Sequence, residues 1–171
     1  MTIEGSTGAG AAPRRIRLGM VGGGQGAFIG AVHRIAARLD DCYELVAGAL
    51  ASQPQRAAAS AAEMHIAPER AYADFRAMAK AEVARPDGID VGAIVTPNHL
   101  HAPIATAFLD AGIDVICEKP LSTSLGDALA LVEKVRSSGR LFALTHNYSG
   151  YPMVRQAREM VAAGELGEIR L

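Results

Sequence analysis

The sequence is poor in the features that mark several classes of protein. Only two of its 171 residues are cysteines, Cys42 and Cys117, and they form no CxxC motif. This argues against a disulfide framework or a cysteine-based zinc site and favours a reducing, cytoplasmic environment. No apolar run reaches the ~18 residues of a membrane span, and a net charge of −1 gives no basic field for nucleic acid or anionic lipid. We therefore expect no nucleic-acid partner and no membrane partner.

What is present is the composition of a globular domain. Half of the residues are hydrophobic and 20% are charged, which excludes a wholly disordered chain. The length suits about one domain. Residues 1–13 are dominated by Gly, Ser, Thr and Ala, with neither a basic start nor an apolar core, so they do not read as a targeting signal. We expect a disordered leader there, with order beginning near Arg14.

Short apolar segments alternate with helical patterns along the rest of the chain. Strands are expected over residues 16–21, 43–50, 91–95, 114–117 and 141–144. Helices are expected over residues 27–39, 55–64, 74–84, 102–111, 124–137 and 153–163. Such alternation produces right-handed βαβ units around a parallel sheet. The predicted fold is therefore α/β, with an open, doubly wound, mostly parallel sheet; a closed barrel is typically longer, at ~250 residues.

Two of these helices carry apolar side chains at helical spacing, and two have capping signals. The apolar faces comprise Phe28, Val32, Ile35, Ala36 and Leu39 in the first helix, and Leu125, Leu129, Val132 and Val135 in the helix over residues 124–137. Asp74 is a plausible helix cap, and Ser124 with Asp127 resembles a capping box.

A glycine-rich loop joins the first strand to the first helix. Residues 22–27 read GGGQGA and fit the pattern G-x-G-x-x-A. A pyrophosphate needs backbone N–H donors and the positive end of a helix, and side chains at these positions would block its approach. We predict that the loop binds the phosphates of a dinucleotide; the alternative is a flexible turn without a ligand. The expected contacts are Gly22, Gly24, Gln25, Gly26, Ala27 and Phe28.

The end of the second strand lacks the carboxylate that usually holds the ribose hydroxyls of NAD. Residues 50–56 read LASQPQR. Ser52 can bind a ribose hydroxyl or a 2′-phosphate, and Arg56 can balance phosphate charge. NAD and NADP therefore both stay open. The missing acid also counts against a SAM-dependent methyltransferase, which uses a similar loop and usually has an acidic residue at this point.

Two further polar loops follow strands at the same edge of the predicted sheet. Residues 96–101 read TPNHLH and residues 118–120 read EKP. In open α/β sheets, ligands bind outside the carboxyl ends of the strands. His99 and His101 offer two metal ligands, but no third and fourth ligands stand at a compelling spacing, so no metal site is expected. Cys117 is expected to be a buried, inert thiol.

With these motifs the chain resembles the nucleotide-binding half of the Gfo/Idh/MocA oxidoreductases, the group of glucose–fructose oxidoreductase and inositol dehydrogenase. The carrying residues are Gly22, Gly24, Gly30 and His33, Thr96-Pro97-Asn98 with His101, and Glu118-Lys119-Pro120. The resemblance implies a Rossmann domain over residues 14–150, and a linker helix and first strand of a substrate domain over residues 151–171. That domain would supply an Asp/His pair, so this amino-terminal half is expected to bind NAD or NADP with little or no turnover alone.

The resemblance also assigns roles. Thr96, Pro97 and Asn98 line the cofactor with His101 close by, Glu118 lies near the nicotinamide ribose, and Asn147 lines the cleft. Lys119, often followed by a cis peptide bond in this family, is the implied catalytic residue, because its ammonium can stabilise alkoxide character. The implied activity is oxidation of a secondary alcohol of a sugar, polyol or inositol by a homo-oligomeric full-length protein. The alternative is a non-catalytic nucleotide-binding module or sensor, in which Lys119 is idle.

Overall fold

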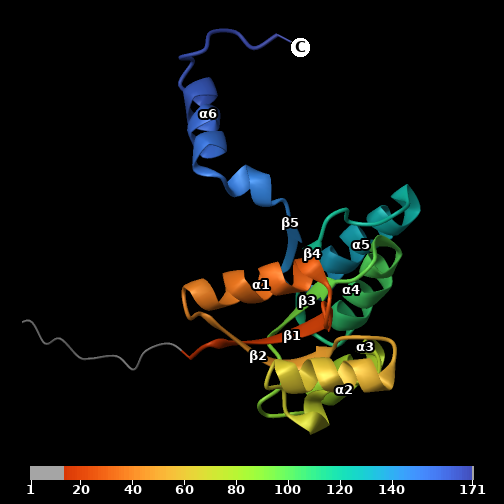
Figure 1. Cartoon of the computed structure of the whole chain (residues 1–171). Helices are drawn as coiled ribbons and strands as arrows, with labels where there is room; N and C mark the ends of the chain where they lie inside the picture. Colours follow the sequence, from red (N-terminus) through yellow and green to blue (C-terminus); the bar gives the residue numbers. More distant parts are fainter. Residues whose placement is uncertain (1–13, 171) are drawn as a thin grey trace, which may run out of the picture.

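The computed structural model describes residues 14–170; the predicted leader over residues 1–13 lies outside them. A five-stranded, all-parallel sheet with the order β2-β1-β3-β4-β5 forms its centre (Figure 1). The strands are β1 (Ile16–Gly22), β2 (Tyr43–Ala49), β3 (Val91–Val95), β4 (Asp114–Glu118) and β5 (Phe142–Thr145). The helices are α1 (Phe28–Leu39), α2 (Pro54–Glu63), α3 (Phe75–Val83), α4 (His101–Asp110), α5 (Leu125–Ser138) and α6 (Pro152–Ala162). Each boundary lies within one residue of its prediction.

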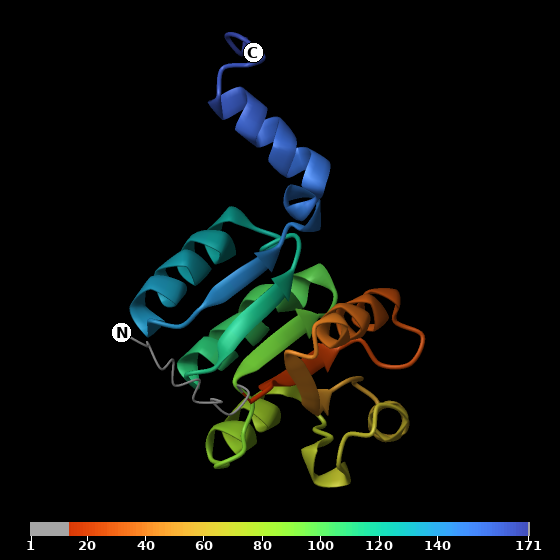
Figure 2. The same ribbon diagram turned by 90° about the vertical axis from the view of Figure 1, so that its left-hand side faces the viewer.

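Helices cover both faces of the sheet (Figures 1 and 2). One core lies between the sheet and α3, α4 and α5, where Met78, Ile104 and Leu131 are buried. The other lies under α1 and α2. Strand β3 supplies both, because Ile94 belongs to the first core while Ala93 belongs to the second. The predicted doubly wound parallel sheet is confirmed, and burial on both faces explains why its strands are apolar throughout.

The order of the sheet is the one usual for dinucleotide-binding folds. On the outer edge of β2, Gly48 of that strand forms an isolated parallel bridge with Ala71. Counting this short segment as the third strand in the chain gives the order 3-2-1-4-5-6. The connection from this segment to β3 crosses to the other side of β1, and the loops after β1 and β3 flank the point where the order reverses.

Asp74 and Ser124 are both confirmed as helix caps, but the Asp127 carboxylate accepts from the Ser124 hydroxyl rather than from its amide, so the capping box is not complete. The Asp74 carboxylate accepts hydrogen bonds from the amides of Arg76 (2.7 Å) and Ala77 (3.1 Å). The Ser124 hydroxyl oxygen accepts one from the Asp127 amide at 3.1 Å and donates to the Asp127 carboxylate at 2.8 Å. These contacts satisfy amides that the first turn of a helix leaves without partners.

The predicted apolar face of α1 does not point into the core. Phe28 is 82% exposed and Leu39 is 77% exposed. The helix instead packs on the sheet side through Ile29, Gly30 and Ala37. On α5, Leu125 and Leu129 are likewise exposed, whereas Leu131 is buried. Val135 of the predicted α5 face packs against the first core, so that face is only partly exposed.

Helix α6 stands away from the sheet (Figures 1 and 2). It lies within the predicted linker region, but residues 163–170 contain no strand. The assignment of residues 151–171 to the start of a second domain therefore stays a prediction. No helix within residues 14–170 combines the length and apolarity needed to cross a bilayer.

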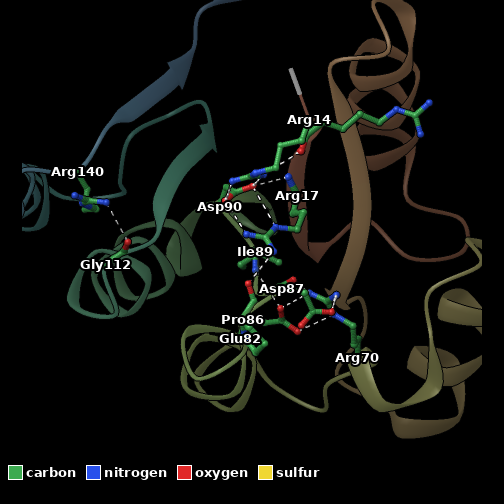
Figure 3. Close-up of polar contacts among 11 residues, drawn as sticks. Arg14, Arg17, Arg70, Glu82, Pro86, Asp87, Ile89, Asp90, Gly112 and Arg140 are labelled. Carbon is green, nitrogen blue, oxygen red and sulfur yellow. Dashed lines mark hydrogen bonds and ion pairs between the residues drawn. The ribbon is translucent and has the colours of Figure 1, made fainter. Parts of the chain in front are cut away.

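The amino ends of the strands are held by ion pairs (Figure 3). Asp90, just before β3, accepts hydrogen bonds from the Arg14 guanidinium at 2.7 and 2.9 Å and from the Arg17 amide at 2.8 Å. The hydrogen bond from Arg14, followed by those from Arg17, holds the pKa of the Asp90 carboxyl well below its usual value, although burial acts in the opposite direction. The carboxylate thus ties the segment before β1 to the start of β3.

This lowered pKa predicts a stability that depends on pH. A carboxyl group whose pKa is depressed on folding stabilises the fold above its unfolded pKa of about 3.9 and loses that effect as the pH falls further. Asp90→Asn is therefore expected to lower the free energy of unfolding at pH 7, and the difference from wild type should shrink below about pH 4. Urea unfolding of both proteins at pH 7 and below about pH 4 measures this difference in the free energy of unfolding. Asp110→Asn, which removes a more exposed pair with Lys134, is the control, and a deficit for Asp90→Asn that is equal at both pH values contradicts the prediction.

Candidate functional site

The polar loops predicted from the sequence meet at one edge of the sheet. Strand pairing sets Gly22 beside Val95, Ile94 beside Cys117 and Glu118 beside Thr145, so the carboxyl ends of four adjacent strands are level. The glycine loop follows β1, residues 96–98 follow β3, and Glu118 ends β4, with Lys119 next to it. Asn147 follows β5 and is exposed. The predicted convergence of these loops is thus present.

Gly22 and Gly23 form the turn that leaves β1. Both have a positive φ, 79° and 72°, which disfavours side chains. A Cβ on Gly22 would lie 2.8 Å from the Val95 carbonyl oxygen and 3.0 Å from the Thr96 methyl group. The absence of a side chain therefore lets the loop lie against the end of β3.

The packing of α1 on the loop shows that Gly30 is the third small residue of the glycine motif. A Cβ on Gly30 would lie 2.4 Å from the Gly23 Cα and 2.7 Å from the Gly23 carbonyl oxygen. Helix α1 thus approaches the loop at a point three residues after Ala27, the position expected from the G-x-G-x-x-A pattern. Ala27 instead precedes the helix in an extended conformation. Gly30 is among the residues that carry the family resemblance, and its contact with Gly23 gives the packing reason for a glycine at this position.

Gly30→Ala is expected to weaken both the fold and dinucleotide binding. Alanine normally favours a helix by about 1 kcal/mol over glycine, but the contact with Gly23 is with backbone that cannot give way, and overpacking typically costs ~1–3 kcal/mol. Thermal unfolding and NADH titration measure the two effects. Gly126→Ala, in the open first turn of α5, should not destabilise. Equal stability of Gly30→Ala and wild type would contradict the packing role.

The amides of Gly24 and Gln25 are engaged within the protein. Gly24 donates to the Leu50 carbonyl oxygen at 3.2 Å, and Gln25 donates to the Ser60 hydroxyl at 3.0 Å. Ser60 is buried in an alanine-rich helix and was not identified from the sequence. These two amides fix the loop against β2 and α2, because distant chain segments supply their acceptors, and a contact of Gly24 or Gln25 with a dinucleotide stays a prediction.

The start of α1 and the outer part of the loop are suited to an anion. Helix α1 has no side-chain cap and no acidic residue in its first turn. Its terminal amides and the positive end of its dipole therefore remain for a ligand. Gly26 has a φ of 78° and open space where a side chain would be. The Ala27 amide donates to the Gly24 carbonyl oxygen at 3.0 Å, so among the predicted contacts in this loop Gly26 and Phe28 are in the best position to bind phosphate through their backbone.

Arg56 lies over the same loop. Its guanidinium donates to the Gln25 carbonyl oxygen at 3.4 Å, and the Gln25 side chain in turn donates to Glu63 at 2.8 Å. Ser52, after β2, is exposed. A cation at this point can balance phosphate charge, while Ser52 can meet a ribose hydroxyl. The structure brings both predicted residues to the side of the glycine loop that faces β2.

Thr96 begins the loop after β3, and its methyl group lies against Gly22. Its hydroxyl oxygen is buried and has no hydrogen-bond partner within residues 14–170. Such groups are uncommon in folded proteins and point to an absent partner. Pro97 and Asn98 are exposed beside it. The orphaned hydroxyl, the bare Gly22 backbone and the uncapped α1 together fit a dinucleotide that lies across the ends of β1 and β3.

His101 is turned into the protein. Its side chain is completely buried, with Nδ1 2.7 Å from the Pro120 carbonyl oxygen and Nε2 3.0 Å from the Thr96 carbonyl oxygen. Both ring nitrogens are thus engaged within the protein, and the closeness of His101 to the cofactor stays a prediction. His101 joins the loop after β3 to the loop after β4 and positions both.

Glu118 and Lys119 stand at the end of β4 in different environments. Glu118 is buried, and its carboxylate accepts hydrogen bonds from His33 Nε2 at 2.8 Å and from the Lys119 amide at 3.1 Å. Lys119 is exposed, and the Lys119–Pro120 bond is cis, as the family resemblance implies. Burial, followed by the neighbouring Glu118 charge, raises the pKa of Cys117 to about 12, which agrees with an inert thiol.

Known proteins share this domain. The model of the Gfo/Idh/MocA family, described as an oxidoreductase family with an NAD-binding Rossmann fold, matches residues 16–146. The structure of an oxidoreductase from Sinorhizobium meliloti is 59% identical, with a TM-score of 0.88, and the match covers 92% of this chain and 44% of that one. The structure of an inositol dehydrogenase homologue from Azotobacter vinelandii, complexed with NADH and myo-inositol, is 43% identical, with a TM-score of 0.89 and coverage of 92% and 41%.

A levoglucosan dehydrogenase from Pseudarthrobacter phenanthrenivorans is 31% identical over 91% of this chain and 39% of its own length. The chain thus spans 39–44% of the length of these three proteins. The family match argues against the SAM-dependent methyltransferase, because the matched family is an oxidoreductase family with an NAD-binding fold. The chain therefore belongs to the Gfo/Idh/MocA oxidoreductase family, in which it forms the NAD-binding Rossmann domain.

Proposed function

We propose that this chain is the cofactor-binding and lysine-bearing part of an NAD(P)-dependent dehydrogenase that acts on a secondary alcohol of a sugar, polyol or inositol. The observation that carries the proposal is the position of Lys119, one residue after β4, on the same sheet edge as the glycine loop after β1. The substrate class is supported by the relatives, which include an inositol dehydrogenase homologue crystallised with myo-inositol and a levoglucosan dehydrogenase.

The glycine loop and its neighbours would hold the cofactor. The backbone amides of Gly26 and Phe28 would bind the pyrophosphate at the start of α1. The Thr96 hydroxyl would donate a hydrogen bond to the nucleotide. This bond would remove the free-energy cost of a buried hydroxyl without a partner. Ser52 and Arg56 would meet the ribose on the β2 side. Residues 50–56 contain no carboxylate that would repel a 2′-phosphate. Both NAD and NADP are therefore candidates.

Lys119 would act on the substrate oxygen. When bound, the nicotinamide accepts the hydride that leaves the alcohol carbon. The Lys119 ammonium would donate a hydrogen bond to the hydroxyl oxygen and stabilise the negative charge that develops as the hydroxyl proton passes to a base, for which the Asp/His pair predicted in the second domain is the candidate. The cation is exposed rather than buried in an ion pair, since its Nζ makes no hydrogen bond or salt bridge within residues 14–170. It is therefore available to a substrate that lies over the nicotinamide.

Cofactor binding and turnover test the proposal separately. Calorimetric titration of the chain with NADH and with NADPH should give saturable binding of at least one of them. The complete natural protein that contains this chain should reduce NAD⁺ or NADP⁺ when inositols and sugars are supplied. Absence of binding by both cofactors at millimolar concentration would overturn the proposal. Binding without any turnover would favour the non-catalytic sensor.

Homo-oligomeric assembly and a cytoplasmic location stay predictions from the sequence. The exposed side chains of Leu125 and Leu129 on α5 support the first, because apolar side chains that share a helix face favour contact with another surface. Sedimentation of the complete protein measures its mass in solution, and a monomer at micromolar concentration would contradict the assembly.

A further inference from the structure

His33 of α1 contacts the strand end that carries Lys119. Its Nε2 lies 2.8 Å from Glu118 Oε1, and the side chains of His33 and Glu118 are 14% and 9% exposed. Strand β3 lies between β1 and β4, so the contact joins the helix after the glycine loop to a strand that is not adjacent to β1. An ionised carboxylate only accepts hydrogen bonds, so the proton of this bond is on His33 Nε2.

The Glu118 carboxylate has a donor at each oxygen. Oε1 accepts from His33, and Oε2 accepts from the amide of Lys119 at 3.1 Å. A buried carboxylate that loses a hydrogen-bond donor needs another donor or an ion pair. The next side chain along the chain is that of Lys119, which is exposed and makes no ion pair within residues 14–170. Without His33, this ammonium is a cation with which the freed carboxylate can pair, and the substrate requires the same ammonium.

We propose that His33 is a positioning residue for Lys119. The hydrogen bond from His33 holds the Glu118 carboxylate where its second oxygen accepts from the Lys119 amide. The Lys119 ammonium then stays unpaired and can bind the substrate. This inference rests on the proposed dehydrogenase function. It assigns α1 two roles, because the amino end of the helix faces the phosphates while its second turn sets the charge at the reacting end of the site.

The test compares His33→Leu, which has no donor, with His33→Gln, whose side-chain amide can reach the same oxygen. Both are made in the complete natural protein, with Arg38→Gln on the exposed side of α1 as control. His33→Leu should lower kcat by about tenfold or more, as expected for loss of a hydrogen bond to a charged group, and leave the Kd for NADH within about threefold. His33→Gln should restore most of kcat.

A second pair of variants separates positioning from general packing. In a Glu118→Ala background, His33→Leu should have no further effect on kcat, because the carboxylate that it frees is absent. An equal loss in both backgrounds would overturn the role of His33 in orienting Glu118, as would wild-type kcat in His33→Leu. If His33→Leu does not fold, failure of the folded His33→Gln to retain kcat would overturn it too. A wild-type protein that binds no NADH would instead overturn the proposed function.

Discussion

Lys119→Ala is expected to reduce turnover of the complete natural protein by about 10²–10⁴-fold while the Kd for NADH changes by less than about threefold. The ammonium is placed to act on the substrate oxygen, whereas phosphate binding is assigned to the glycine loop and α1. Loss of the side chain should therefore affect the chemical step and leave most cofactor contacts intact. Stopped-flow single-turnover rates and NADH fluorescence titration measure the two quantities.

Two variants sharpen this result. Lys119→Arg keeps the charge but presents a planar, bulkier group in place of the compact ammonium, so we expect little recovery of turnover. Lys134→Ala removes a lysine whose pair with Asp110 lies on the surface, and it should behave as wild type. Full activity of Lys119→Ala would contradict the assigned chemistry and favour the sensor alternative.

Arg70→Leu is expected to lower the free energy of unfolding by about 3–5 kcal/mol, because it leaves a buried carboxylate without its cation. Glu82 on α3 is 1% exposed and is bonded by the Arg70 guanidinium, by the Tyr72 hydroxyl at 2.7 Å and by the Ile89 amide at 3.1 Å. Burial, followed by the Glu82 carboxylate, raises the pKa of Tyr72 to about 12. The cluster joins the segment after β2 to α3 and to the start of β3 (Figure 3).

Urea unfolding measures this loss. Replacing both partners, as Arg70→Leu with Glu82→Leu, should recover part of it, since an apolar pair needs no compensating charge. Arg85→Leu, which removes a more exposed pair with Asp87, should cost less than about 1 kcal/mol. Because the cluster lies at the amino ends of the strands, NADH binding by folded Arg70→Leu should match wild type. A loss below about 1 kcal/mol would contradict the role of the pair.

Several parts of the site were not accessible from the sequence because their partners are distant in the chain. The pattern around Gly24 and Gln25 could not show that Leu50 and Ser60 would take up their amides. The TPNHLH motif could not show that His101 turns inward while Thr96 keeps a buried hydroxyl without a partner. Likewise, the apolar spacing on α1 marked a common face for Phe28 and Leu39 but could not show that this face lies outside.

The sequence alone determined the alternation of strands and helices, the helix caps, and the gathering of the glycine loop, residues 96–98 and Glu118-Lys119 at one sheet edge. These follow from local periodicity and from the rule that parallel strands end together, neither of which needs a distant contact. Only the tertiary structure decided that Gly30 packs on Gly23, that His33 holds Glu118, and which polar atoms remain free for a ligand. Those outcomes depend on distances of a few tenths of an ångström between segments far apart in the chain, and hydrogen bonding and packing are decided at that scale.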